Sequence, residues 1–103
     1  MSTTETSVRS KIVPKENVAV PPLFNVIYIN DNETTMEFVI ESLRADFHYD
    51  EEAATALTVK IHDDGSAVVA TLPYEMAEQK GIEVTLLARN NGFPLNVKLE
   101  VAT

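Results

Sequence analysis

Residues 24–36 read Phe-Asn-Val-Ile-Tyr-Ile-Asn-Asp-Asn-Glu-Thr-Thr-Met, and this stretch joins a strand, a polar turn and the start of a helix. The segment Leu23–Asn30 carries β-branched and aromatic residues on both alternating faces, which is typical of a strand buried on both sides. The apolar run ends at Asp31, and Thr34 and Glu37 match a capping box that begins a helix. The junction therefore places several oxygen acceptors beside an apolar wall, which suits a small cation attached to an apolar group.

The remaining elements follow from periodicity and end signals. Apolar residues recur at helical spacing to about Asp46, and a second helix is predicted from its cap at Asp50 to Gly65. Strands are predicted at 66–72 and 95–101, separated by a third helix that Pro73 opens. The order strand, helix, helix, strand, helix, strand favours an α+β domain: a three-stranded antiparallel sheet with three helices packed mainly on one face.

Gly81 lies in the middle of the third predicted helix. Glycine costs roughly 1 kcal/mol relative to alanine at such a position. We expect a close approach of this helix to the sheet to explain it.

Composition and charge limit the function. The chain has 103 residues, a formal net charge of −8 and no cysteine. This charge argues against nucleic acid or an anionic membrane surface as the main partner, since both attract basic faces. Without cysteine there is no disulfide, no thiolate nucleophile and no zinc site built on sulfur, and we expect no metal and no cofactor. No apolar stretch reaches the roughly 20 residues that span a bilayer.

The chain divides into two parts. Residues 1–20 are polar and rich in Ser and Thr, and Pro14 with Pro21-Pro22 discourages helix at their junction with the body. We predict a flexible N-terminal extension over residues 1–20 and a folded core over residues 21–103.

Asp31 and His62 are the residues most able to carry chemistry, supported by Asn30, Asn32 and Thr34. An ammonium group has three donors and no acceptor, so a carboxylate, an amide oxygen and a neutral imidazole would satisfy it. A peptide's free α-amine beside a large apolar first side chain fits this description. The alternative is structural: a solvated turn that caps a helix, and a histidine that compensates the dipole at a helix C-terminus.

A set of ordered residues resembles the ClpS family of protease adaptors. The likeness begins with Pro21-Pro22-Leu23-Phe24-x-Val26-Ile27, Asn30-Asp31 and Thr34-x-Met36-Glu37-Phe38-Val39. It continues with Phe47, Ala54-Thr55, Ile61-His62, Gly65, Glu75-x-Ala77-Glu78-x-Lys80, Ala88-Arg89, Pro94-Leu95 and Leu99-Glu100. It covers about residues 21–101.

The resemblance implies a non-enzymatic factor of the N-degron pathway, cytoplasmic or in the plastid stroma of a plant. Such adaptors bind substrate proteins with N-terminal Leu, Phe, Tyr or Trp and deliver them to the N-terminal domain of a ClpA- or ClpC-type AAA+ unfoldase, which feeds the ClpP peptidase. It also implies a monomer, and an N-terminal extension that engages the unfoldase during hand-over.

Family roles carry over to matching positions. The α-amine is held by residues matching Asn30, Asp31 and His62, and Glu75 and Lys80 match positions that dock on the unfoldase. The side-chain pocket is lined by residues matching Thr34, Met36, Val39, Thr58, Ile61 and Leu95.

Three positions depart from the family pattern. Asn32 replaces a usual Asp, which lowers negative charge near the amine, and Thr58 replaces a usual Met, which predicts a roomier or wetter pocket. Pro73 replaces a hydroxyl residue at the start of the third helix, a change that affects stability more than function. Two alternatives stay open: a degenerate member that docks without reading N-termini, and an enzyme that uses Asp31 and His62 as an acid–base pair. The chain offers no convincing nucleophile for the latter.

Overall fold

A computed structural model describes residues 20–103 of the chain. The predicted N-terminal extension, residues 1–20, lies outside the described residues except for Val20. The described part forms β1 (Leu23–Ile29), α1 (Met36–Phe47), α2 (Glu51–Asp64), β2 (Ser66–Pro73), α3 (Tyr74–Asn90) and β3 (Asn96–Val101). The predicted α+β class and the order β-α-α-β-α-β are confirmed.

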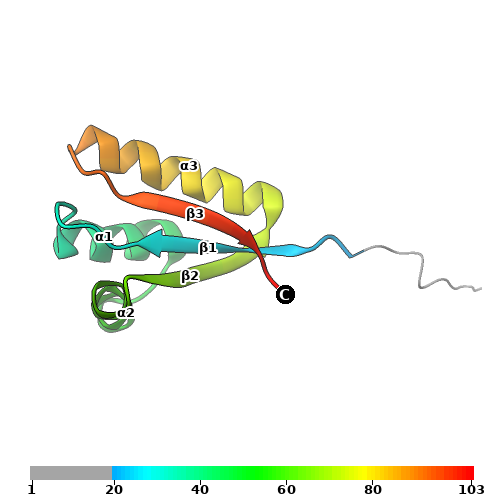
Figure 1. Cartoon of the computed structure of the whole chain (residues 1–103), viewed down its shortest axis with the longest axis horizontal. Helices are drawn as coiled ribbons and strands as arrows, with labels where there is room; N and C mark the ends of the chain where they lie inside the picture. The colour runs from blue at the N-terminus through cyan, green and yellow to red at the C-terminus, as the bar shows by residue number, and fades with distance from the viewer. Residues whose placement is uncertain (1–19) are drawn as a thin grey trace, which may run out of the picture.

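The sheet is antiparallel with strand order β2-β1-β3, and the helices cover one of its faces (Figure 1). Ile29, the last residue of β1, pairs with Ser66 at the start of β2 and with Asn96 at the start of β3. The loop after β1, the end of α2 and the loop before β3 therefore meet at one edge of the sheet.

The core lies between this sheet and the helices. Val26 and Tyr28 of the central strand are fully buried, as are Leu43 of α1 and Val84 of α3. Ile27, on the opposite face of β1, is only half-buried. The expectation of a strand buried on both sides is therefore wrong for the outer face, because no helix covers it.

The start of α1 differs from the predicted capping box. The Thr35 hydroxyl, not that of Thr34, caps the helix by accepting a hydrogen bond from the Phe38 amide at 3.1 Å. Thr34 instead gives both its amide and its hydroxyl proton to the Asp31 carboxylate. These charge-assisted hydrogen bonds hold Thr34 in the loop after β1, and Thr35 provides the cap.

The ends of α2 match the prediction. The Asp50 carboxylate accepts from the Ala53 amide at 2.8 Å, and Gly65 ends the helix at φ +90°, a left-handed conformation that favours glycine. α3 follows Pro73 without a side-chain cap.

Gly81 does not serve a close helix–sheet approach. A Cβ built there would lie 3.7 Å from Val97 Cγ1 and 4.0 Å from Leu99 Cδ2, which are ordinary van der Waals distances. The packing explanation predicted for this glycine is therefore wrong.

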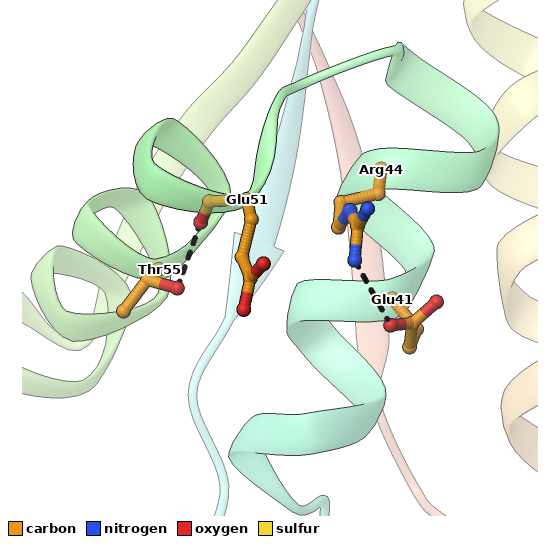
Figure 2. Close-up of polar contacts among 4 residues, drawn as sticks. All are labelled: Glu41, Arg44, Glu51 and Thr55. Atoms are coloured by element: carbon orange, nitrogen blue, oxygen red, sulfur yellow. Dashed lines mark hydrogen bonds and ion pairs between the residues drawn. The ribbon is translucent and has the colours of Figure 1, made fainter.

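The outer surfaces of α1 and α2 carry polar contacts unrelated to the edge of the sheet described above (Figure 2). Arg44 Nη1 lies 3.5 Å from Glu41 Oε2, and the Thr55 hydroxyl donates to the Glu51 carbonyl one turn earlier at 2.8 Å. Both partners of the ion pair are exposed, so its contribution to stability is small, roughly 0–1 kcal/mol. Within residues 20–103, no helix has the length and apolar character needed to cross a membrane.

Candidate functional site

The candidate site lies at the edge of the sheet where β1 ends. The Asn30 amide donates to the Gly65 carbonyl at 2.9 Å, which joins the loop after β1 to the end of α2. His62 is exposed and lies in the last turn of α2, one turn before Gly65. The structure therefore brings Asn30, Asp31 and His62 to the same edge, although they are about 30 residues apart in sequence.

Asp31 is held by its own loop. Its Oδ1 atom accepts from the amides of Glu33 (2.8 Å) and Thr34 (2.7 Å), and its Oδ2 atom accepts from the Thr34 hydroxyl (2.8 Å). A carboxylate has about four acceptor sites, so at least one remains for a ligand. The three hydrogen bonds fix the orientation of the carboxylate before a ligand arrives.

The charge of Asp31 is secured by the same contacts. Partial burial acts to raise its pKa. The hydrogen bonds from Thr34 and Glu33, together with the field of the Arg89 guanidinium, outweigh burial and hold the pKa of Asp31 below its ordinary value. The loop therefore presents a negative charge at neutral pH, which suits a cationic ligand.

Arg89 organises the opposite side of this edge. Its Nη1 atom donates to the Phe93 carbonyl at 3.0 Å and to the Leu95 carbonyl at 2.9 Å. The ring of Phe93 contacts that of Phe38 on α1, with centroids 5.2 Å apart. The α3–β3 loop is thus fixed by a guanidinium on one side and an aromatic contact on the other, which sets the position of Leu95.

The predicted side-chain pocket takes its residues from four segments: the loop after β1, α1, α2 and the loop before β3. Most members of the predicted side-chain pocket are buried, whereas Thr34 is half-buried and Met36 is 43% exposed. The buried members are Val39, Thr58, Ile61 and Leu95. Three of them belong to the hydrophobic core, so the wall of the proposed pocket is continuous with the core.

Thr58 uses its proton inside its own helix. Its hydroxyl is buried and donates to the Ala54 carbonyl at 2.7 Å. The hydroxyl oxygen therefore keeps acceptor capacity but has no proton to offer a ligand.

A buried polar pair, Tyr28 and Ser42, contacts the backbone of Val39, a residue of the predicted side-chain pocket. The Ser42 hydroxyl donates to the Val39 carbonyl at 2.9 Å, which leaves the Tyr28 hydroxyl to donate to Ser42 Oγ at 2.8 Å. Burial strongly raises the pKa of the Tyr28 phenol, so it stays protonated. This relay ties the central strand to α1 at Val39.

Sequence reasoning gave no role to Arg89, Tyr28 or Ser42. An arginine in the last turn of a helix usually compensates the helix dipole, and that signal conceals contacts with a later loop. For Ser42 the only indication of a buried role was weak: it is a polar residue beside apolar Leu43 in the same helix.

The predicted docking residues lie on α3. Glu75 is exposed, whereas the side chain of Lys80 is 27% exposed, with its Nζ atom 3.9 Å from Glu83 Oε1. Five residues at about 100° each place the two side chains on different sides of the helix, roughly 140° apart. A partner that contacts one side of α3 would therefore not reach the Glu75 and Lys80 side chains equally.

A separate hollow of about 270 Å³ lies between α3 and β3. It is lined by Glu78, Gly81, Ile82, Thr85, Leu86, Val97 and Leu99, and shares no residue with the predicted side-chain pocket. Among residues 20–103, no three His, Asp or Glu side chains gather closely enough to hold a metal ion.

Comparison with known proteins agrees on one family. The family model described as "ATP-dependent Clp protease adaptor protein ClpS" matches residues 19–98. An ATP-dependent Clp protease adapter protein ClpS from Nautilia profundicola is 42% identical over 83 residues, covering 81% of this chain and 86% of that protein. The protein of the same name from Sodalis glossinidius is 44% identical over 88 residues, covering 85% of this chain and 83% of that protein.

A solved structure is also similar. The structure of Agrobacterium tumefaciens ClpS2 bound to L-phenylalaninamide aligns with a TM-score of 0.78 and 36% identity, covering 81% of this chain and all of that one.

Proposed function

Because the chain belongs to the ClpS family of ATP-dependent Clp protease adaptors, we propose that it binds bulky hydrophobic N-terminal residues of substrate proteins, namely Leu, Phe, Tyr and Trp. It delivers these substrates to a Clp AAA+ unfoldase for degradation. The protein contributes recognition and no catalytic step of its own.

The observation that carries this proposal is the Asp31 carboxylate, which three hydrogen bonds fix in orientation and hold ionised. Asp31 accepts a hydrogen bond from the substrate's α-ammonium group, the Asn30 side-chain oxygen accepts a second, and an imidazole nitrogen of His62 accepts a third. The arrangement favours a free N-terminus over a lysine, because the apolar first side chain of the substrate must lie directly beside the charge.

The first side chain of the substrate enters a pocket lined by Thr34, Met36, Val39, Thr58, Ile61 and Leu95. Burying a Leu or Phe side chain contributes roughly 1.5–3 kcal/mol. Met36 is exposed whereas Thr58 and Leu95 are buried, which supports a pocket with Met36 at its rim and the other two residues deeper. L-Phenylalaninamide, bound to the similar A. tumefaciens structure, carries the same combination of α-amine and apolar side chain.

Two residues shift the preference of this pocket. Thr58 is smaller than the methionine usual in the family and keeps acceptor capacity on its oxygen. We expect a relative gain for Trp and Tyr, whose polar hydrogens can use that acceptor. We also expect room for Ile or Val as the first residue of the substrate. Asn32 carries no charge, so the α-amine is held with less electrostatic attraction than in relatives with an aspartate there.

Delivery requires a second surface. Glu75 and Lys80 dock on the N-terminal domain of a ClpA- or ClpC-type unfoldase, and the N-terminal extension assists hand-over. The protein acts as a monomer in the compartment of that unfoldase, the bacterial cytoplasm or the plastid stroma. Deleting residues 1–20 leaves peptide affinity intact but slows degradation of a delivered substrate, whereas unchanged degradation would contradict the role of the extension.

A panel of short peptides that differ only in their first residue tests the proposal. Fluorescence anisotropy with a labelled Phe-initiated peptide and unlabelled competitors gives the ranking. The proposal expects micromolar or tighter binding for Leu, Phe, Tyr and Trp, and at least tenfold weaker binding for Ala, Ser or Asp. Binding to the unfoldase without discrimination among peptides would favour the alternative of a docking modulator that does not read N-termini.

A further inference from the structure

Gly81 is placed where the fold has no need for it. Glycine is among the poorest residues for a helix interior, because it loses the most backbone freedom on folding. Gly81 has no positive φ, unlike Gly65 and Gly92. A Cβ at this position would make ordinary contacts with Val97 and Leu99, so alanine would fit and would favour the helix. Internal packing does not account for this glycine.

Gly81 is instead one of the residues that line the hollow between α3 and β3. Its volume of about 270 Å³ is slightly below the range of roughly 300–1,000 Å³ that is usual for small-molecule pockets. Gly81 forms part of its wall, and the side chains of Val97 and Leu99 lie behind it. The hollow suits one or two apolar side chains of a partner protein better than a whole small ligand.

The surroundings indicate the character of that partner. Ile82 and Leu86, which line the hollow, are 54% and 59% exposed, a high exposure for large apolar side chains. Glu78 also lines the hollow, and Glu75 lies on the same stripe of α3 as Ile82 and Leu86. Within residues 20–103, no cationic side chain pairs with Glu75 or Glu78. An apolar group flanked by a basic one would therefore complement this surface.

We propose that the hollow around Gly81 receives an apolar side chain of the unfoldase's N-terminal domain, with a basic residue beside it that pairs with Glu75 or Glu78. The inference rests on the proposed docking at Glu75 and extends that surface along α3 to Leu86. A second copy of this chain is a poor occupant, because its net charge of −8 would bring more negative charge to an acidic rim. The glycine thus trades helix stability for binding.

The test uses the full-length chain, full-length Clp unfoldase and three readouts: thermal unfolding, affinity for the unfoldase, and affinity for a Phe-initiated peptide. Gly81→Ala is expected to raise the Tm by about 4–8 °C. Gly81→Leu, which fills the hollow, is expected to weaken unfoldase binding at least tenfold. Both variants should bind the peptide within twofold of the unsubstituted chain, because the predicted pocket shares no residue with the hollow.

A matched pair of substitutions on α3 completes the test. Leu86→Glu, at the hollow, is expected to weaken unfoldase binding at least tenfold. Leu87→Glu, on a neighbouring exposed side chain that does not line the hollow, should change it less than twofold. This comparison separates the hollow from a general effect of charge on α3.

The results that would contradict the inference can be told apart. Normal unfoldase binding by Gly81→Leu, with binding lost in Glu75→Lys, would overturn the inference and leave the proposed docking intact. Normal binding by both variants would overturn the docking proposal as well. A monomer–dimer shift caused by Gly81→Leu would assign the hollow to a second copy. An effect of Gly81→Leu that vanishes when residues 1–19 are deleted would assign the hollow to the chain's own N-terminal segment. Either of these two results also overturns the inference.

Discussion

Replacing Asp31 with asparagine should weaken peptide binding far more than it weakens the fold. The side-chain oxygen of asparagine can still accept from the Glu33 and Thr34 amides, which now bond to Asp31 Oδ1 at 2.8 and 2.7 Å. The amide nitrogen, however, replaces the oxygen that faces the Thr34 hydroxyl, and it offers donors rather than acceptors. The substitution thus removes the charge and one acceptor while largely keeping the shape of the loop.

The magnitude follows from the contact that is lost. A hydrogen bond to a charged group contributes roughly 1.5–3 kcal/mol, which corresponds to about 10- to 150-fold in Kd. Thr34→Val removes only the hydroxyl contact to Asp31 and keeps the charge, so it should weaken binding by less than about tenfold. Glu52→Gln removes an exposed carboxylate at the start of α2 and serves as the control for net charge.

Fluorescence anisotropy with a Phe-initiated peptide gives the affinities, and circular dichroism confirms that each variant is folded. The reasoning requires the order Glu52→Gln, Thr34→Val, Asp31→Asn in increasing loss of affinity. An Asp31→Asn variant that binds within about threefold of the unsubstituted chain would refute the role of this carboxylate.

Three further predictions concern the support of the site and its titration. Ser42→Ala should destabilise the fold by roughly 1–3 kcal/mol because it leaves the buried Tyr28 hydroxyl without an acceptor, whereas Tyr28→Phe should cost only about 0.5–1.5 kcal/mol; urea unfolding measures both, and the reverse order would contradict the assigned donor. Arg89→Met removes the donors that hold the loop before β3 and one of the causes of the low pKa of Asp31. NMR titration should show that the pKa of Asp31 rises, and anisotropy should show that peptide affinity falls. An unchanged pKa of Asp31 would exclude the electrostatic effect of Arg89. Peptide affinity should stay level near neutral pH and fall in acid as the pH drops through the lowered pKa of Asp31, because protonation removes the charge that holds the ammonium group. The contribution of Asp31 to stability, which is present at neutral pH, should be lost over the same acid range, and an affinity that does not change there would contradict the role of Asp31.

The order of elements was predictable because local signals and tertiary structure agree. Asp50 and Gly65 delimit α2 through a cap and a left-handed turn that any surroundings would favour. The alternation in β3 is likewise a local pattern, with Val97 and Leu99 half-buried between exposed neighbours. Such features depend on a few adjacent residues, which the sequence displays directly.

Two of the errors, at the start of α1 and at Gly81, arose from properties that adjacent residues do not display. Thr34 and Thr35 are both suitable caps, and the contacts that separate them form in the folded chain: Thr34 donates its N–H and its O–H to the Asp31 carboxylate, and Thr35 caps the helix. A glycine in a helix interior favours a packing requirement at Gly81, and only the positions of Val97 and Leu99 in the folded chain reveal the spare room. Such contacts and free volume are properties of the assembled chain, so the sequence could not decide them.

The candidate site was predictable in part. That Asn30, Asp31 and His62 lie at one edge follows from a strand end and a helix end, and the bond from the Asn30 amide to Gly65 joins these two segments. Their roles in binding an α-amine stay predictions. The contributions of Arg89 and of the Tyr28–Ser42 pair required the structure, because each joins segments that are distant in the chain or separated by a loop.

The central claim is that the protein binds a free, positively charged N-terminus through Asp31. Isothermal titration calorimetry with a Phe-initiated peptide and with its N-acetylated form tests it most directly. The account predicts that acetylation, which removes the charge and two of the donors, abolishes measurable binding. Equal affinity for the two peptides would contradict it.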